Sequence, residues 1–100
     1  MDLNIQILDK VEVFLSSVPS RDRAKILATV TMMEAGTAKA VITRQISGSI
    51  RELKVKQYRI LYFQHEHSLY FVGGFTKKSQ KTPLREIEKA RQIQKLIIKK

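Results

Sequence analysis

The spacing of apolar residues changes twice along this chain, and these changes limit the folds that it can adopt. Near the N-terminus, Val11, Phe14, Leu15 and Val18 recur at the three- and four-residue spacing of one helix face. From residue 50 to residue 75 the spacing shortens to two, among β-branched and aromatic residues. A helical spacing then returns and continues toward the C-terminus. Helices, a block of strands and a final helix predict an α+β fold.

The first third of the chain is predicted to form two helices. Pro19 ends the first helix, and Ser20 is a suitable N-cap for the second. Gly36 suits the C-cap of that second helix. The inward residues of the second helix are expected to be Ile26, Leu27, Val30 and Met33. Because the break between the two helices is short, they are predicted to form an antiparallel helical hairpin.

Three apolar runs in the middle of the chain predict strands. They are "IRELKV" (50–55), "YRILYF" (58–63) and "LYFVGGF" (69–75), joined by the polar turns "KQ" and "QHEHS". This order predicts a three-stranded antiparallel meander. The preceding stretch, 36–49, has no strong pattern and is predicted to be a loop, punctuated by Gly48 and Ser49. The pair Gly73-Gly74 inside the last run indicates a β-bulge or a close approach of backbones.

The last part of the chain predicts a helix. Thr82 and Pro83 form an N-cap and first-turn pair. The inward face is expected to carry Ile87, Ala90, Ile93 and Ile97. We find no repeat and no second domain, so residues 1–100 are expected to form one domain, with its helices on one face of a small sheet.

The charge of the chain is strongly uneven. The net charge is +10, and the second half carries thirteen Lys and Arg against four Asp and Glu, whereas the first half carries six against five. Such a directed positive field suits nucleic acid, an acidic protein or an anionic membrane. No apolar stretch is long enough to span a membrane, "MDLNIQ" lacks the basic-then-apolar pattern of a secretory signal, and cysteine is absent. We therefore expect a cytoplasmic protein that does not bind membranes.

Strand alternation indicates which basic side chains share a surface. Lys54 and Arg59 can face one concave surface beside the connection that carries Lys77 and Lys78. The full basic set is Arg51, Lys54, Lys56, Arg59, Lys77, Lys78, Lys81 and Arg85. A solvated charged surface is the alternative interpretation. Since unpaired like charges repel one another and cost stability, we favour a surface that binds phosphates.

Other candidate sites are weaker. His65 and His67 flank Glu66 in a predicted turn, but no third ligand is evident, so we expect no metal ion and no other cofactor. Among the aromatic residues, Phe63, Phe71 and Phe75 are expected in the core. Tyr58 and Tyr62 are left open between the core and stacking on nucleic-acid bases.

The residues of the second half resemble a known family. "IRELKVKQYRILYF" and "FVGGFTKKSQKTPLREIEKA" are similar to the phage-derived, HigB-like branch of the RelE superfamily of bacterial toxins. In that branch an E-L-basic strand precedes a Y-R-I-x-Y-F strand, and F-x-K-K-S-Q-K-T-P leads into a helix. "FLSSVPSRDRAKIL" also resembles the helical hairpin of the family, so the likeness covers about four fifths of the chain.

The resemblance implies a RelE-like fold and the toxin of a type II toxin–antitoxin system. Such toxins are endoribonucleases that cleave mRNA, commonly on the ribosome. It also implies a cognate helix-turn-helix antitoxin, through which alone the complex contacts operator DNA. Carried over by position, the implied catalytic residues are Lys54, Arg59, Lys77 and Lys78, with Lys54 at a position where arginine is common. We expect Arg51, Lys56, Lys81 and Arg85 to hold the flanking RNA backbone.

Cleavage by this set needs no metal. We expect Lys54 to act as base or phosphate ligand, Arg59 as transition-state clamp, and Lys77 or Lys78 as acid or clamp. On this hypothesis, replacing Arg59 with Ala abolishes toxicity and leaves the fold intact. Two alternatives stay open. One is a non-catalytic RNA- or ribosome-binding module or inactive toxin relic, and the other is a basic face that serves only an acidic antitoxin.

Overall fold

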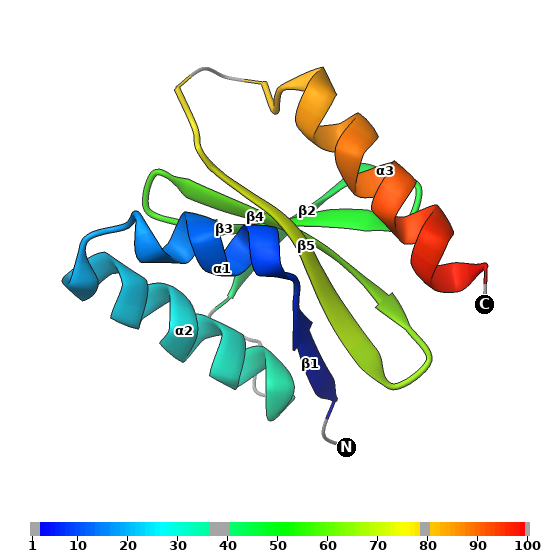
Figure 1. The fold of residues 1–100 in the computed structure, drawn as a ribbon. Helices are drawn as coiled ribbons and strands as arrows, with labels where there is room; N and C mark the ends of the chain where they lie inside the picture. The colour runs from blue at the N-terminus through cyan, green and yellow to red at the C-terminus, as the bar shows by residue number, and fades with distance from the viewer. Residues whose placement is uncertain (1–2, 37–40, 79–80, 100) are drawn as a thin grey trace.

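A five-stranded sheet lies between two layers of helices (Figure 1). The structure is a computed structural model and describes residues 3–36, 41–78 and 81–99. Its elements, in chain order, are β1 (Asn4–Ile7), α1 (Asp9–Ser16), α2 (Ser20–Glu34), β2 (Ile42–Ser47), β3 (Ile50–Val55), β4 (Tyr58–His65), β5 (Ser68–Thr76) and α3 (Leu84–Ile98). Within these ranges, no helix is both long and apolar enough to cross a membrane.

The predicted meander is confirmed, but it forms only the middle of the sheet. The strand order is β1-β5-β4-β3-β2, with all pairs antiparallel except β1 with β5. The prediction of three strands is therefore wrong. β1 and β2 are the two edge strands, and neither contains a buried residue. Because an edge strand without buried residues has no need of a strong apolar pattern, these two strands carry no clear signal in the sequence.

Two-residue turns join β2 to β3, β3 to β4 and β4 to β5. Each turn begins with a residue of positive φ: Gly48 at 57°, Lys56 at 54° and Glu66 at 57°. The "KQ" turn is as predicted. The pair Gly48-Ser49, predicted as part of a long loop, is a tight hairpin turn instead. Positive φ at the first turn residue is typical of hairpins, because it matches the twist of the strands.

The helices cover both faces of the sheet, so the prediction that they share one face is wrong. α1 and α2 pack on the face that carries Leu53, Ile60 and Phe71. α3 packs through Ala90, Ile93 and Ile97 on the opposite face, against the buried side chains Ile50, Leu61, Phe63 and Val72. Every residue from Tyr58 to Phe63 is buried. A strand buried on both faces reads as a continuous apolar run, which is what "YRILYF" is apart from its arginine.

The helix starts differ from the predictions by one residue. Pro19 and Pro83 occupy the N-cap positions, and the helices begin at Ser20 and Leu84. Neither helix has a side-chain hydrogen bond at its cap. Thr82 is therefore not a cap, since its hydroxyl points to the sheet. Gly36, with φ 77°, directly follows the C-cap residue of α2, as a terminating glycine does.

The inward face of α2 is narrower than predicted. Ile26, Val30 and Met33 are buried, whereas Leu27 is 41% exposed. One residue advances a helix by about 100°, so Leu27 lies beside the buried stripe rather than in it.

The glycine pair in β5 lies at a bulge, as predicted, but the predicted close approach of backbones is not found there. The register shifts so that Leu61 pairs with Gly73 while Tyr62 pairs with Phe71, which leaves Val72 as the extra residue of a bulge. A Cβ on Gly74 would lie 2.5 Å from Cδ2 of Phe14. The close approach is therefore that of an α1 ring, and not of a second backbone.

Candidate functional site

Lys54, Arg59 and Phe75 form a row across three strands on the α3 side of the sheet. Lys54 of β3 pairs with Arg59 of β4, and Arg59 pairs with Phe75 of β5. Since paired residues of neighbouring strands point to the same face, these three side chains are neighbours. Lys54 is exposed, Phe75 is half-buried and Arg59 is buried. The strand alternation that placed Lys54 and Arg59 together is confirmed.

Arg59 is held from several sides. Its Nη1 donates to the carbonyl oxygen of Lys56 at 2.7 Å and to that of Tyr58 at 2.9 Å. Its Nε lies 3.7 Å from Oε1 of Glu52. Nη2 makes none of these contacts. The expectation that Ala can replace Arg59 and leave the fold intact stays a prediction. These contacts give it less support, because the change would strip partners from a buried carboxylate and a turn.

Glu52 is a residue of the site that the sequence analysis did not single out. Its carboxylate is buried, with 3% of the residue exposed. Oε2 accepts a hydrogen bond from Oγ1 of Thr82 at 2.5 Å, and Oε1 lies 3.4 Å from Nη2 of Arg44. The sequence did contain a signal for Glu52. Strand alternation places residues 52 and 54 on the same face, so Glu52 was expected on the face of the predicted site.

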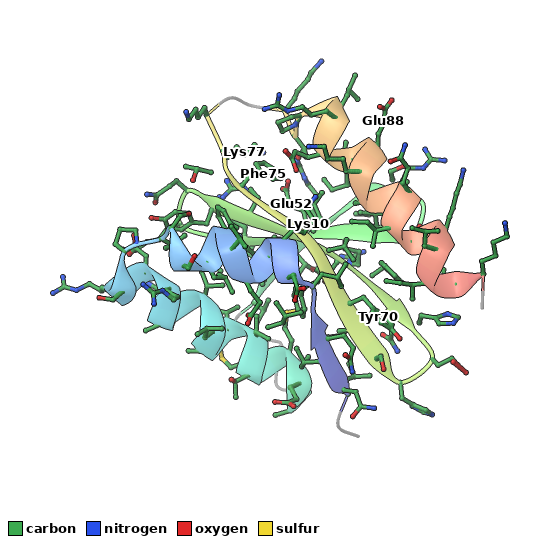
Figure 2. The ribbon with its side chains drawn as sticks, in the orientation of Figure 1. Lys10, Glu52, Tyr70, Phe75, Lys77 and Glu88 are labelled. Atoms are coloured by element: carbon green, nitrogen blue, oxygen red, sulfur yellow. The ribbon has the colours of Figure 1, made fainter. Side chains whose placement is uncertain are left out.

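The chain leaves the sheet beside this row. Figure 2 shows Phe75, Lys77 and Glu52 near the end of β5 from which the chain continues to α3. The backbone N–H of Lys77 donates to the carbonyl oxygen of Gln57 at 2.8 Å. This bond fixes Lys77, which is half-buried, against the β3–β4 turn, while Lys78 is exposed.

A hollow of about 460 Å³ adjoins the start of α3. Three cations line it: Lys78, Lys81 and Arg85. The rings of Phe14 and Phe75 lie on its walls. The structure therefore extends the basic row into a second basic surface.

Two predicted RNA-binding residues point elsewhere. Arg51 alternates to the α1–α2 face, where its Nη2 donates to Oγ1 of Thr43 at 3.1 Å. Lys56 donates from Nζ to Oδ1 of Asp22 on α2 at 2.8 Å. The hydrogen bond from Lys56 is the main reason that the pKa of Asp22 lies below its ordinary value, and a hydrogen bond from Tyr58 is the second. The structure does not bring Arg51 or the ammonium of Lys56 to the row.

A family comparison bears on the identity of this chain. Residues 13–95 match the family described as Phage derived protein Gp49-like (DUF891). The chain belongs to the Gp49-like family. The resemblance to a phage-derived family is thereby confirmed, whereas the HigB assignment stays a prediction. No curated protein matches this Gp49-like chain.

A solved structure shares the fold of the Gp49-like chain. It is the crystal structure of an archaeal RelE–RelB complex from Pyrococcus horikoshii OT3, with a TM-score of 0.64 and 16% identity. The match covers 81% of this chain and 100% of that one. At this identity the likeness establishes the fold alone, and it confirms the RelE-like fold.

The structure of the Gp49-like chain also shows where the candidate aromatic and histidine residues lie. Phe63 and Phe71 lie in the core as predicted, and Tyr58 and Tyr62 are also buried, so stacking on bases is not open to these two. Phe75 is only partly buried, against the α3 side of the core. His65 lies 3.8 Å from Glu66. Within the described ranges, no three His, Asp or Glu side chains converge on one point.

Proposed function

We propose that this Gp49-like protein is the toxin of a type II toxin–antitoxin system and acts by cleaving mRNA. One observation carries the proposal: the cross-strand pair Lys54–Arg59, with Lys77 tied to the turn between their strands. An array of cations on a RelE-like fold, next to a basic hollow, suits the backbone of RNA. The strong net charge, +10, provides the attraction at longer range.

The proposed chemistry is internal attack within the RNA. The 2′-oxygen of one ribose bonds to the adjacent phosphorus as the bond from phosphorus to the 5′-oxygen breaks. The products are a 2′,3′-cyclic phosphate and a 5′-hydroxyl. A base accepts the proton of the 2′-hydroxyl, an acid supplies a proton to the leaving 5′-oxygen, and cations stabilise the charge on the phosphorane.

The structure suggests how the residues divide these roles. Lys54 is exposed at the end of the row, so it can take the 2′-proton in its neutral form or bind the phosphate. Arg59 is always charged and is held by its Nη1 and Nε, which leaves Nη2 to approach the phosphate. Lys77 or Lys78 supplies the proton to the leaving group or a second positive contact.

Flanking nucleotides are proposed to follow the hollow at the start of α3. Lys78, Lys81 and Arg85 would contact their phosphates there, and the partly buried ring of Phe75 offers a stacking surface. The RNA-binding roles of Arg51 and Lys56 stay predictions. Their contacts with Thr43 and Asp22 give these roles less support.

The proposed partners are mRNA, bound on the ribosome, and a cognate antitoxin. The solved structure with the same fold is titled as a complex of RelE with RelB. By analogy, a small antitoxin with a helix-turn-helix domain would cover part of the basic surface, and it alone would contact operator DNA. The site of action would be the cytoplasm.

Induced expression tests the proposal. The parent protein should stop growth, and primer extension on a translated message should show discrete cuts that disappear when translation is blocked. Lys54→Ala and Lys77→Ala should lose the cuts. Lys95→Ala is the matched control, since Lys95 is an exposed lysine about 16 Å farther along α3 than its start.

The outcomes separate the possible functions. A parent that binds RNA but never cuts it would leave the binding module as the function. A parent that neither binds RNA nor slows growth, yet binds an acidic protein encoded beside it, would contradict both RNA-directed functions.

A further inference from the structure

We propose that Glu52 is a positioning residue. Its buried carboxylate holds the connection between β5 and α3 against the Lys54–Arg59 row. This connection carries Lys77, Lys78 and Lys81, and we call it the basic segment. The inference rests on the proposed function, because it assigns how the cations of that site are kept in place. Glu52 would touch no RNA, and it would act through Thr82 and Arg59.

The first step concerns the two ends of the segment. At its start, the backbone N–H of Lys77 is bonded to Gln57 in the β3–β4 turn at 2.8 Å. At its end, the hydroxyl of Thr82 is bonded to Glu52 at 2.5 Å. Both anchors thus lie on β3 or on the turn that follows it. Lys77, Lys78 and Lys81 fall between them, so the chain carrying these lysines is tied to the sheet at each end.

The second step concerns the kind of bond. A hydroxyl that donates to a carboxylate forms a charge-assisted hydrogen bond, which is shorter and stronger than a bond between neutral groups. Thr82 itself is 8% exposed, so water competes little for this bond. Thr82 directly precedes Pro83, the N-cap residue of α3, and its hydroxyl is bonded to the sheet rather than to the start of the helix.

The third step concerns the charge of Glu52. A carboxylate with 3% exposure is costly to bury unless it is paired. Oε1 faces Arg44 at 3.4 Å and Arg59 at 3.7 Å, and Oε2 faces Thr82. One carboxylate therefore orients the guanidinium of the row with one oxygen and anchors the basic segment with the other.

An amide cannot serve both sides. If Gln at position 52 gives its oxygen to Thr82, its NH₂ group faces two guanidinium groups, which have no acceptor for it. If it turns around, the guanidinium groups keep an oxygen, but Thr82 loses the charged acceptor. Glu52→Gln should therefore preserve the shape of the site and loosen one of its two attachments.

The decisive experiment uses two substitutions of Thr82. Thr82→Val removes the hydroxyl at nearly constant volume, and Thr82→Ser keeps the hydroxyl. Glu52→Gln is the second test variant. Glu88→Gln is the matched control, because Glu88 is exposed on α3. Each variant is assayed at a temperature at which its melting curve shows it to be folded.

Three quantities are measured on the full chain. The first is hydrogen exchange of peptides covering residues 74–78 and 81–87. The second is kcat and KM for cleavage of a message on translating ribosomes, and the third is the affinity for a non-cleavable 2′-deoxy oligonucleotide. Thr82→Val should raise exchange and lower kcat by about tenfold each, as expected for a lost bond to a charged acceptor, with a smaller change in KM. Thr82→Ser should restore both values, and Glu88→Gln should resemble the parent.

Several results would overturn the role. A folded Thr82→Val protein with the exchange and kcat of the parent would do so. Faster exchange with unchanged kcat would also do so, since the bond would then be merely structural. If the parent cuts no RNA, the proposed function fails, and the positioning role is decided by exchange and oligonucleotide affinity: both changed in Thr82→Val supports it, and either one unchanged refutes it.

Discussion

The hydroxyl of Tyr58 donates to the carboxylate of Asp22 across 2.8 Å and so joins the start of β4 to the first turn of α2. Lys56, two residues earlier, donates to the other oxygen of the same carboxylate at 2.8 Å. The β3–β4 turn is therefore fastened to the helical hairpin on one face of the sheet. The same turn also accepts the backbone N–H of Lys77, just beyond the β4–β5 ladder. A change at Asp22 can thus reach the candidate site through one turn.

The Asp22 contact predicts a pH dependence of stability. Hydrogen bonds from Lys56 and Tyr58 lower the pKa of Asp22 from its ordinary 3.8 in the folded protein. A lowered folded pKa means that the contribution to stability is present above about pH 4 and is lost as the pH falls through the folded pKa. The free energy of unfolding of the parent should therefore drop below pH 4 more steeply than that of Asp22→Asn. Urea unfolding between pH 2 and pH 7 measures this.

At alkaline pH, the dependence of stability on pH has the opposite sign. The bond to Asp22, together with burial, raises the pKa of Tyr58 above its ordinary 10.0. That contribution is present below pH 10 and is lost as the pH rises through the raised value. Tyr58→Phe, which cannot ionise, should remove it. If the stabilities of parent and Asp22→Asn ran parallel across both limbs, the contact would not contribute to folding.

Arg44 and Arg59 share one carboxylate, and their burial predicts very different costs of removal. Arg59→Ala should lower the free energy of unfolding by about 3 kcal/mol, because it leaves Glu52 buried beside an empty space. Arg44→Ala should cost less than about 1 kcal/mol, since the side chain of Arg44 is 55% exposed. Chemical denaturation at neutral pH compares the two, and equal costs would contradict the burial argument. Toxicity of Arg59→Ala must accordingly be compared at equal amounts of folded protein.

Gly73 and Gly74 form a matched pair for a test of packing. A Cβ on Gly74 would collide with the ring of Phe14, so Gly74→Ala should destabilise by about 1 to 3 kcal/mol. A Cβ on Gly73 would meet Leu61 at an ordinary 3.8 Å, so Gly73→Ala should change stability by less than about 1 kcal/mol. Restored stability in the Phe14→Leu, Gly74→Ala double variant would identify the ring as the obstacle. A harmless Gly74→Ala would show that Phe14 moves aside freely.

Binding of RNA should depend on salt through the row. If Lys54 contacts a phosphate, Lys54→Ala should reduce the slope of log K against log salt by about 0.7 for a single-stranded oligonucleotide. Lys95→Ala, the exposed lysine far along α3, should leave that slope unchanged. Fluorescence anisotropy with a 2′-deoxy oligonucleotide between 50 mM and 300 mM salt gives both slopes. An equal loss in the two variants would indicate a diffuse field rather than a site.

The strand pattern predicted the part of the site that lies in the middle of the sheet. Alternation in β3 and β4 placed Lys54 and Arg59 on one face, and the pairing of the strands made them direct neighbours. Alternation shows which face of the sheet a side chain lies on, but not how far it is buried. Arg59 is buried on the face that α3 covers, whereas the sequence patterns had placed all the helices on one face and did not say which.

Other features depend on contacts between distant residues. Thr82 has the residue type that predicts a helix cap, just before a proline, but the carboxylate of Glu52 draws its hydroxyl to the sheet. Lys56 is a turn residue whose ammonium binds a helix 34 residues earlier in the chain. β1 is four residues long, too short for its alternation to stand out, and it becomes a strand because the edge of β5 is open to it.

The parallel pairing of β1 with β5 has a consequence for folding during translation. Asn4 pairs with Ser68 and Ile7 with Phe71, so β1 has no partner until α1, α2, β2, β3 and β4 have all been translated. At about 5 to 20 residues per second, that wait lasts several seconds. Leu8 then donates its backbone N–H to Phe71 as the chain enters α1. The sheet is therefore closed at this edge only after β5 has been made, shortly before Lys77 and Lys78 emerge to complete the basic surface.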